Sequence, residues 1–560
     1  MTEQSESAKT GPEPAAGHGP GFGRFVYRCK QPLFALPFYG VTLAGAGATE
    51  LAFTPIDPWP GDAEVGAEIV QGRFDFAGLC LQNPQPLWTP RESSLAWREA
   101  LHGFAWLRDL RAAGGDGARR RARDLVARWM DDNANRWDSL IWGPEVTGER
   151  LTHWLGHYEF YAASAQVDFR HRLLYEACRQ ARHLARALPA GLTSASAVTA
   201  LKGLIIAGAC LPGGEAWLRR GLQLLCQELP RQLLSDGGHI ERSPRRMVEL
   251  LRDLIDIRAA VSGARQDLPD QIQAAIDGLA PMVRLLQHGD GGLALFNDSN
   301  EGEGWQVDMV LQRAGGRSRP WMSAPDSGFQ RLHAGRTVVL VDAGAPPPHG
   351  ADRQAHAGTL SFEMSVGRER LIVNCGAHQG DPDWRRAQRL TAAHSTLVLD
   401  DINSAEVARD GALRRRPEAV NCRREEQDGS QWLDMTHDGY RRRCHQLHHR
   451  RLYLATNGDD LRGEDCLEGD GGEAFKIRFH LHPEVAADLT QSGDGVILRL
   501  GKGGGWRMRA EGAQPRLEDS IYLGTAGQPR RSRQIVLEGP VNPPETVVKW
   551  ALRREAKLGA

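Results

Sequence analysis

Four clusters in this 560-residue chain carry side chains that can take part in chemistry. The first, residues 236–244, contains Asp236, His239, Glu241 and Arg242 and ends in Ser-Pro. Ser at an N-cap followed by Pro is typical of a helix start, so this stretch is predicted to be a turn between two helices. Turns of this kind carry functional side chains, although a solvated, capped turn explains the same residues.

The other three clusters lie further along the chain. Residues 289–299 are rich in Gly, Asn and Asp, include Asp298, and can also be read as a plain linker. In residues 349–363 and 384–396, His and Arg precede a predicted strand. The third cluster contains His356, and the fourth begins at Trp384.

A candidate metal site combines two of these clusters. His356 and His394 flank a predicted strand that ends at Asn374-Cys375. His and Cys are ligands that zinc prefers, so His356, Cys375 and His394 are a candidate zinc set. The alternative is that each His makes an ordinary hydrogen bond at a strand edge.

The first half of the chain must supply helices to position these residues. Apolar residues recur at i, i+3 and i+4 from Ser93 onward, with short Gly- and Pro-containing breaks. Such helices, joined by short turns, favour an α-solenoid or an α/α toroid, and no fixed-period repeat supports ankyrin-, TPR- or HEAT-type solenoids. The predicted helices span residues 92–113, 117–131, 146–165, 168–188, 195–210, 213–235, 244–262 and 268–287.

After about residue 325 the apolar period changes to two, which indicates strands. A large antiparallel sandwich is the simplest arrangement of so many strands. The predicted strands span residues 336–342, 359–365, 370–374, 395–400, 451–455, 475–481, 496–500 and 546–552. The fold class is therefore α+β, multidomain. Its parts are a disordered tail (1–21), a helical domain (22–325) that opens with an irregular segment (22–90), and a β-sandwich (326–560).

Bulk composition narrows the function classes. The 69 Lys and Arg balance 70 Asp and Glu, which argues against a dedicated nucleic-acid binder. Nine unpatterned cysteines favour reduced thiols. The N-terminus lacks the basic and apolar regions of a signal peptide, and no stretch is apolar enough for a membrane span. These features predict a cytoplasmic protein.

In this order, the clusters resemble the heparinase II/III family of polysaccharide lyases over roughly residues 55–555. The motifs that carry the resemblance are Asp236–Pro244, Ala355–Glu363, Arg389–Thr396, His449–Tyr453, Asp460–Asp465 and Phe479–Pro483. The resemblance implies an incomplete α/α toroid followed by an antiparallel β-sandwich, with a glycan groove where they meet. It also implies a periplasmic or cell-envelope location as the alternative to the cytoplasm.

The resemblance further implies cleavage of an acidic glycan at a uronic acid by β-elimination. That reaction needs a group that neutralises the carboxylate, a base for the C5 proton, and an acid for the leaving oxygen. This chain departs from the family pattern where a Tyr-His pair is usual, because Arg246 and Met247 stand there. It also has neither Asn nor His in residues 193–197, and Asn374 in place of a metal-binding Asp.

The leading hypothesis is therefore a lyase acting on a uronic-acid-containing polysaccharide. The catalytic candidates are His239, Glu241, His356 and Arg389; the substrate-binding candidates are Arg242, Arg246, Asp298 and Trp384; and the metal candidates are His356, Cys375 and His394. Zinc is the one cofactor considered, and a homodimer is left open.

Two other functions remain. One is a non-catalytic glycan-binding or envelope-biogenesis protein on the lyase scaffold. The other is a glycoside hydrolase that pairs Glu241 with Asp298 or Asp236, because hydrolysis needs two carboxylates that flank the bond.

Overall fold

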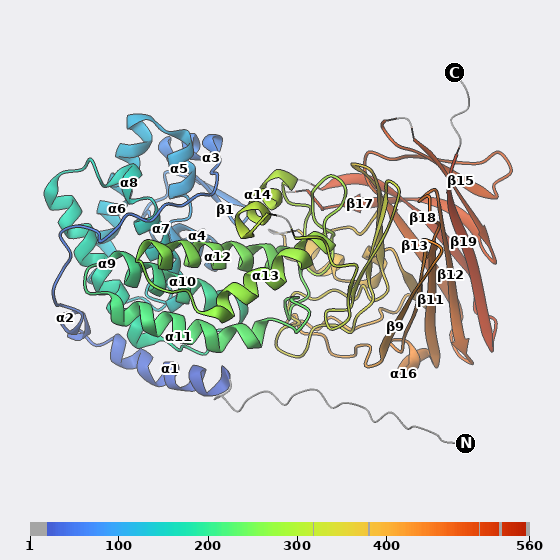
Figure 1. The fold of residues 1–560 in the computed structure, drawn as a ribbon, viewed down its shortest axis with the longest axis horizontal. Coiled ribbons are helices and arrows are strands. Elements are labelled where there is room, and N and C mark those ends of the chain that lie inside the picture. Colours follow the sequence, from blue (N-terminus) through green and yellow to red (C-terminus); the bar gives the residue numbers. More distant parts are fainter. Residues whose placement is uncertain (1–19, 317, 379–380, 503, 526–528, 556–560) are drawn as a thin grey trace. The chain divides into compact units, whose positions relative to one another are not determined.

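The structure, a computed structural model, describes residues 20–316, 318–378, 381–502, 504–525 and 529–555. The tail predicted for residues 1–21 lies outside these residues except for its last two positions. Figure 1 shows the helical elements of the first half and the strands of the second. The described residues form two compact units, one from residues 20–70 and 101–224 and the other from residues 71–100 and 225–555. Among the described residues, no helix combines the length and apolar character needed to cross a bilayer.

Six of the eight predicted helices are present within a few residues of their expected ends, and those predicted at 92–113 and 146–165 are each divided into two shorter helices. Within the segment expected to be irregular, β1 (Arg73–Phe76) and β2 (Leu79–Gln82) form a hairpin. The helices of this half are α1 (Pro20–Phe34), α2 (Tyr39–Thr42), α3 (Ala63–Val70), α4 (Leu95–Gly103), α5 (Leu107–Ala113), α6 (Gly115–Asn133), α7 (Pro144–Gly156), α8 (Tyr158–Tyr161), α9 (Val167–Ala187), α10 (Ser194–Cys210), α11 (Glu215–Gln232), α12 (Pro244–Gly263), α13 (Asp270–Leu285) and α14 (Gly304–Ala314).

Helix α1 corrects the expectation that residues 22–90 are irregular. Its Gly residues and Pro32 disfavour a helix locally. Tertiary packing outweighs that preference: the ring of Phe34 lies 5.5 Å from that of Trp137 and 5.0 Å from that of His183. Burial of this apolar side therefore stabilises a helix that propensity alone does not predict.

The second half forms two antiparallel sheets. One has the order β14-β15-β16-β19-β12-β11-β10-β9, and the other has the order β17-β18-β13-β7-β6-β5-β4-β3, with β8 paired to β13. The strands are β3 (Ser323–Ala324), β4 (Phe329–Ala334), β5 (Thr337–Asp342), β6 (Phe362–Val366), β7 (Glu369–Val373), β8 (Leu397–Leu399), β9 (Val420–Gln427), β10 (Ser430–His437), β11 (Gln446–Leu454), β12 (Asp460–Gly469), β13 (Ala474–Leu481), β14 (Ala486–Leu489), β15 (Gly495–Arg499), β16 (Gly505–Glu511), β17 (Gln514–Tyr522), β18 (Arg530–Pro540) and β19 (Glu545–Arg554); two short helices, α15 (Pro382–Gln388) and α16 (Arg441–Cys444), lie between them.

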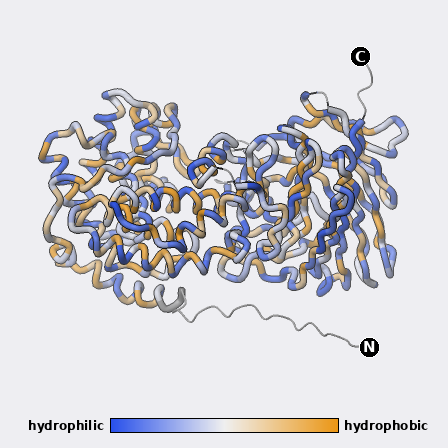
Figure 2. The backbone as a smooth tube through the Cα atoms, viewed as in Figure 1, coloured by the Kyte–Doolittle hydropathy of each residue, from blue (hydrophilic) through white to orange (hydrophobic). Residues whose placement is uncertain are grey.

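The two sheets bury one shared apolar core. Figure 2 shows hydrophobic and hydrophilic residues alternating along these strands, as expected when one face of each is buried. Across the core, the ring of Phe362 in β6 stacks on that of Trp550 in β19, with centroids 5.5 Å apart. The predicted change from helix to strand near residue 325 matches the gap between α14 and β3.

A charged group lies inside this apolar core. Asp465 accepts hydrogen bonds from Arg450 Nε (2.7 Å), His448 Nε2 (2.8 Å) and Trp550 Nε1 (2.9 Å). Burial would raise the pKa of Asp465, but the charge of Arg450 and the bond from His448 outweigh it and hold the pKa well below its usual range. The carboxylate is therefore ionised and links β11, β12 and β19.

We predict that Asp465→Ala lowers the free energy of unfolding by about 3–5 kcal/mol, because Arg450 would keep a buried charge without a carboxylate partner. Urea unfolding followed by tryptophan fluorescence measures this loss. The matched control is Asp488→Ala, which removes a solvent-exposed partner of Arg499 and should cost about 1 kcal/mol or less. Equal losses for the two variants would contradict the assignment.

Candidate functional site

The residue 236–243 turn is held to the β-sandwich by its own side chains. Asp236 accepts hydrogen bonds from the backbone N–H (2.6 Å) and hydroxyl (2.6 Å) of Ser327. His239 is buried: its Nε2 lies 3.4 Å from Gln232 Oε1, and its Nδ1 accepts the Glu241 N–H. Burial lowers the pKa of His239 to about 4. Asp236 and His239 therefore stabilise the turn.

Arg242, predicted to bind substrate, is buried instead. Its backbone has a positive φ of 53°, and its guanidinium donates to Ser327 O (2.5 Å) and Asp342 Oδ1 (2.5 Å). The guanidinium also lies 4.8 Å from the ring centroid of Phe329. Arg242 is thus a structural cation, because its hydrogen bonds fix the turn on the sheet. The sequence could not show this, since Asp342 is a hundred residues away.

The turn leads into a charged network at the start of α12, here called the α12 network: Glu241, Arg245, Arg246, Glu249 and Asp298. Arg245 donates to Asp298 Oδ2 (2.6 Å) and Glu249 Oε1 (2.7 Å), and Arg246 donates to Glu249 Oε2 (2.7 Å). Glu241 lies 3.6 Å from Arg246. Three acids against two cations leave the network with one net negative charge.

The α12 network contains three predicted site residues and two that the predictions missed. Arg245 and Glu249 were missed, although their i, i+4 spacing on a helix is a recognisable signal for an ion pair. The carboxylates proposed to pair with Glu241 in a hydrolase are both engaged by protein groups. Asp298 is bound to Arg245, and Asp236 is bound to Ser327 and Gly238.

His356 and His394 meet, as the metal hypothesis required. His356 Nδ1 lies 3.1 Å from His394 Nε2, and His356 Nε2 accepts the Asp298 N–H at 3.0 Å. His394 Nδ1 lies 2.9 Å from Leu390 O, to which it can only donate. Burial lowers the pKa of His394 to about 4 and that of His356 well below its usual range, so both rings are neutral at neutral pH.

Cys375 does not join them. Its Sγ lies 3.5 Å from His480 Nδ1, and burial raises the pKa of the thiol to about 12. Among the described residues, the groups whose three ligand atoms lie close enough for one metal do not include His356, Cys375 and His394. With Leu390 O and the Asp298 N–H, protein groups already engage all four imidazole nitrogens. The donor set at this position therefore does not fit zinc.

The remaining candidates, Arg389 and Trp384, form no hydrogen bond or ion pair with the α12 network among the described residues, although the charge of Asp298 acts on the Arg389 guanidinium. Arg389 is buried, and its guanidinium donates to the carbonyls of Ala355 (2.8 Å), Asp352 (3.2 Å) and Gly411 (2.6 Å). Trp384 is half-buried on α15. Arg389 therefore holds loops together, and only its burial, which sequence cannot show, distinguishes it from a catalytic arginine.

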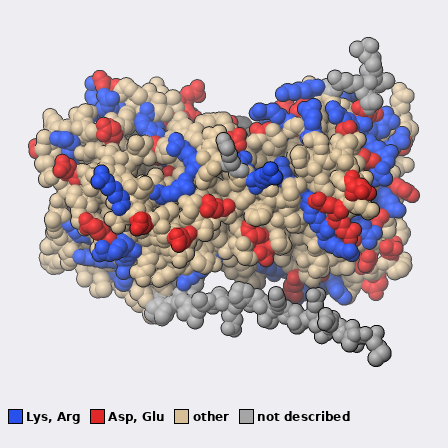
Figure 3. All heavy atoms as spheres, in the orientation of Figure 1, with Lys and Arg blue, Asp and Glu red and all other residues tan. Residues whose placement is uncertain are grey.

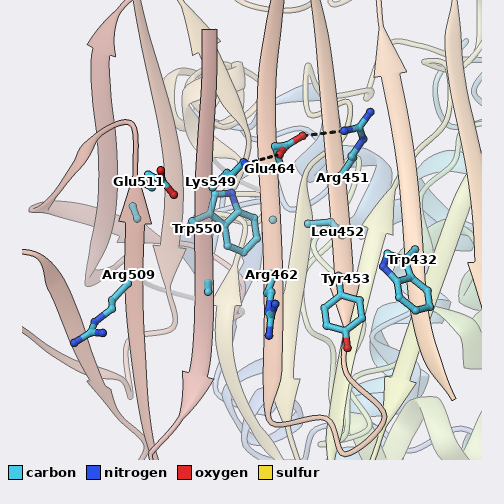
Figure 4. Close-up of a pocket in the computed structure, with 13 residues that line it drawn as sticks. Trp432, Arg451, Leu452, Tyr453, Arg462, Glu464, Arg509, Glu511, Lys549 and Trp550 are labelled. Atoms are coloured by element: carbon cyan, nitrogen blue, oxygen red, sulfur yellow. Dashed lines mark hydrogen bonds and ion pairs between the residues drawn. The ribbon is translucent and has the colours of Figure 1, made fainter. Parts of the chain in front are cut away.

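Besides the α12 network, a group of accessible side chains lies on the outer face of the eight-stranded sheet, around a hollow of about 440 Å³. Figure 4 shows its labelled side chains standing on neighbouring strands. Strand pairing aligns five residues in one cross-strand line, here called the Trp432 row: Trp432, Tyr453, Arg462, Ala551 and Arg509. With strands about 4.8 Å apart, the row is about 19 Å long.

The Trp432 row joins aromatic rings to cations. The rings of Trp432 and Tyr453 have centroids 5.0 Å apart, and the Arg462 guanidinium lies 5.5 Å from the Tyr453 centroid. Arg462 also pairs with Asp460, whereas exposed Arg509 forms no ion pair within the described part of the chain. Ala551 leaves space between the two arginines.

The line beside the Trp432 row has three acids, Asp434, Glu464 and Glu511, and two cations, Arg451 and Lys549. Glu464 pairs with Arg451 (3.0 Å) and Lys549 (3.8 Å), and Figure 4 marks both interactions. Figure 3 likewise shows acidic and basic side chains interleaved over the sandwich. Among the described strand residues of this face, the cation without an ion pair is Arg509, which belongs to the Trp432 row.

Comparison with known proteins agrees with this architecture. The heparinase II/III N-terminus model matches residues 85–314, and the heparinase II/III-like C-terminal model matches residues 316–551. The chain is 31% identical over 533 residues to FtsZ-localized protein C of Caulobacter vibrioides, covering 90% of each chain. This chain belongs to the heparinase II/III-like family.

Solved structures show the same fold. Heparinase III aligns with a TM-score of 0.71 at 15% identity over 96% of this chain and 92% of that one. A mutant of the heparan sulfate lyase HepC from Pedobacter heparinus aligns with a TM-score of 0.66 at 16% identity over 97% and 88%. The predicted order, an α/α toroid followed by an antiparallel β-sandwich, is confirmed.

We predict that His394 makes this protein less stable in acid. The unfolded chain binds a proton below pH ~6.5, whereas the folded chain binds it only near the pKa of about 4. Stability from this group is thus present above pH 6.5 and lost as the pH falls toward 4. Between pH 7 and pH 5, His394→Gln should lose about 2 kcal/mol less unfolding free energy than the native protein. Equal losses in urea titrations would refute this.

Proposed function

We propose that this chain binds an acidic polysaccharide on the lyase scaffold without cleaving it by the family's elimination chemistry. The Trp432 row is the observation that carries the proposal. Sugar rings have apolar faces that pack on aromatic rings, and their carboxylates pair with guanidinium groups. Trp432 and Tyr453 supply the rings, and Arg462 and Arg509 supply the charges.

The charge pattern favours a glycan over a nucleic acid. A single nucleic-acid strand carries one charge per about 3.4 Å, which is five or six along 19 Å. The Trp432 row offers two arginines, and Glu464 and Glu511 lie in the neighbouring line. A chain with a carboxylate only on some of its sugars matches two cations better.

The residues expected to perform elimination support the second part of the proposal. Arg246 and Met247 stand where relatives commonly have Tyr-His, and Met247 is completely buried. His239 and Arg389 are engaged in hydrogen bonds that hold loops. The usual Tyr-His pair is therefore replaced, and His239 and Arg389 are committed to the fold.

We predict binding of heparan sulfate or alginate oligosaccharides with no rise in the ultraviolet absorbance that an unsaturated uronate produces. Trp432→Ala and Arg509→Glu should each weaken binding about tenfold, equivalent to about 1.4 kcal/mol, measured by calorimetry. The matched controls are Trp305→Ala, an exposed Trp on α14, and Arg499→Glu, an exposed Arg on β15. An absorbance rise, or equal weakening by the controls, would overturn the proposal.

A second candidate function, β-elimination, is favoured by one observation. His356 and His394 are neutral and 3.1 Å apart, and a substrate that displaces the Asp298 N–H from His356 Nε2 would give that nitrogen a free lone pair for the proton. Loss of a general acid or base typically costs 10²- to 10⁴-fold in rate. If the protein cleaves a uronate glycan, His356→Gln should lower kcat at least a hundredfold, whereas Trp432→Ala should mainly raise KM. Unchanged turnover in His356→Gln would exclude this route.

A further inference from the structure

A cluster in the helical unit has metal-ligating groups that no functional assignment uses. His153 lies in the last turn of α7, and His157 is the C-cap residue of that helix. Residues four apart share one helix face, and the two imidazole rings lie parallel with centroids 5.6 Å apart. Asp57, from the extended segment before α3, meets them. All three residues belong to the same compact unit.

The distances within this cluster are long for hydrogen bonds. His153 Nδ1 lies 3.5 Å from His157 Nε2, and His157 Nε2 lies 3.5 Å from Asp57 Oδ2. Good N–H···O hydrogen bonds measure 2.7–3.2 Å. In addition, His157 Nδ1 is buried without a hydrogen-bond partner among the described residues. The polar groups of His157 are thus poorly satisfied by protein atoms alone.

The same distances suit a metal ion. Ligands 2.0–2.2 Å from zinc in a tetrahedron lie about 3.3–3.6 Å from one another. The three ligand atoms of Asp57, His153 and His157 all lie within 4.8 Å of one another. Two imidazoles and one carboxylate are a set that zinc and related transition metals accept.

The surroundings keep the ligands in the required protonation states. Burial lowers the pKa of His157 to about 3 and that of His153 well below its usual range, so both rings are neutral. Burial would raise the pKa of Asp57, but hydrogen bonds from Arg108 and its charge hold it well below the usual range. Neutral imidazoles and an ionised carboxylate are the forms that bind metals.

Arg108 also fixes the orientation of the carboxylate. It donates to Asp57 Oδ2 at 2.5 Å through one nitrogen and to both carboxylate oxygens at 3.2 Å through Nε. Such outer partners orient metal-binding side chains. Arg111 lies 3.6 Å from Asp57, and the positive charges of Arg108 and Arg111 repel a metal ion bound beside them. We therefore expect weaker binding than in a closed zinc site with four protein ligands.

We propose that Asp57, His153 and His157 bind a divalent transition-metal ion, zinc being the best fit, as a structural centre of the helical unit. The ion joins the segment at residue 57 to the end of α7. Other donor sets fit less well. The His356–His394 pair lacks a third ligand, and in the set of Cys466, Glu468 and Glu545 the thiol has a pKa raised to about 12 and both Glu residues are exposed.

The test is the zinc content of the purified full-length protein after equilibration with micromolar zinc. We expect one zinc per native chain, and at least tenfold weaker binding in His157→Gln. His394→Gln and Cys466→Ser are matched controls that should bind like the native protein. No zinc in the native chain, or full binding by His157→Gln, would overturn the proposal. Loss of zinc in His394→Gln instead would assign the metal to the sandwich.

Two further measurements separate metal binding from folding. Zinc should raise the Tm of the native protein by several degrees and leave that of His157→Gln unchanged, because a ligand stabilises only a state that binds it. With chelator present, the two proteins should melt at similar temperatures if His157→Gln folds normally. Cobalt substitution should give the intense visible absorption of a tetrahedral site in the native protein only. An equal zinc-dependent Tm shift in both proteins would refute the site.

Discussion

The buried pair of Arg242 and Asp342 is the contact on which the geometry of the α12 network depends. A buried guanidinium needs a partner, and Asp342 at the end of β5 supplies one. Burial raises the pKa of Asp342, and the charge and hydrogen bond of Arg242 offset that rise only in part. Because the pair fixes residues 236–243 on the sheet, it also fixes the start of α12. Arg245 and Asp298 can meet only as a consequence.

The second shared constraint is the pair of hydrogen bonds that joins residues 297 and 298 to the third cluster. Asn297 Oδ1 accepts the His356 N–H, and the Asp298 N–H reaches His356 Nε2. Both Asn297 and Asp298 have positive φ, a conformation that Asn and Asp tolerate better than most residues. The Gly- and Asx-rich stretch that looked like a linker is therefore a shaped loop that seats His356.

Sequence patterns predicted the elements better than the site. Long periodic helices such as α9 and α12 and strands such as β13 were expected nearly to their ends, because one buried face imposes a period. Strands β9 and β10 were missed: β9 is largely exposed and reads RREEQ at its end, so it lacks an apolar signal. Helix α1 was missed because its stability comes from contacts with Trp137 and His183, far along the chain.

The site was harder to predict because residue type does not reveal burial. His239, Arg242 and Arg389 have side chains typical of catalytic residues. In each, the polar atoms form hydrogen bonds with backbone groups or with a buried acid. The His153–His157 spacing was visible in the sequence, but Asp57 lies almost a hundred residues earlier. Pairings over such distances follow from the fold and not from local pattern.

The family motifs themselves have a structural explanation. In residues 236–244, Asp236 holds Ser327, Arg242 holds Asp342, and the Ser243 hydroxyl lies 3.1 Å from that of Ser299. These contacts build the turn whether or not a base stands two residues after the Ser-Pro. A chain can therefore keep the motif and the fold while Arg246 and Met247 replace the usual proton-transfer pair. The motif is evidence for the scaffold, and activity depends on residues outside it.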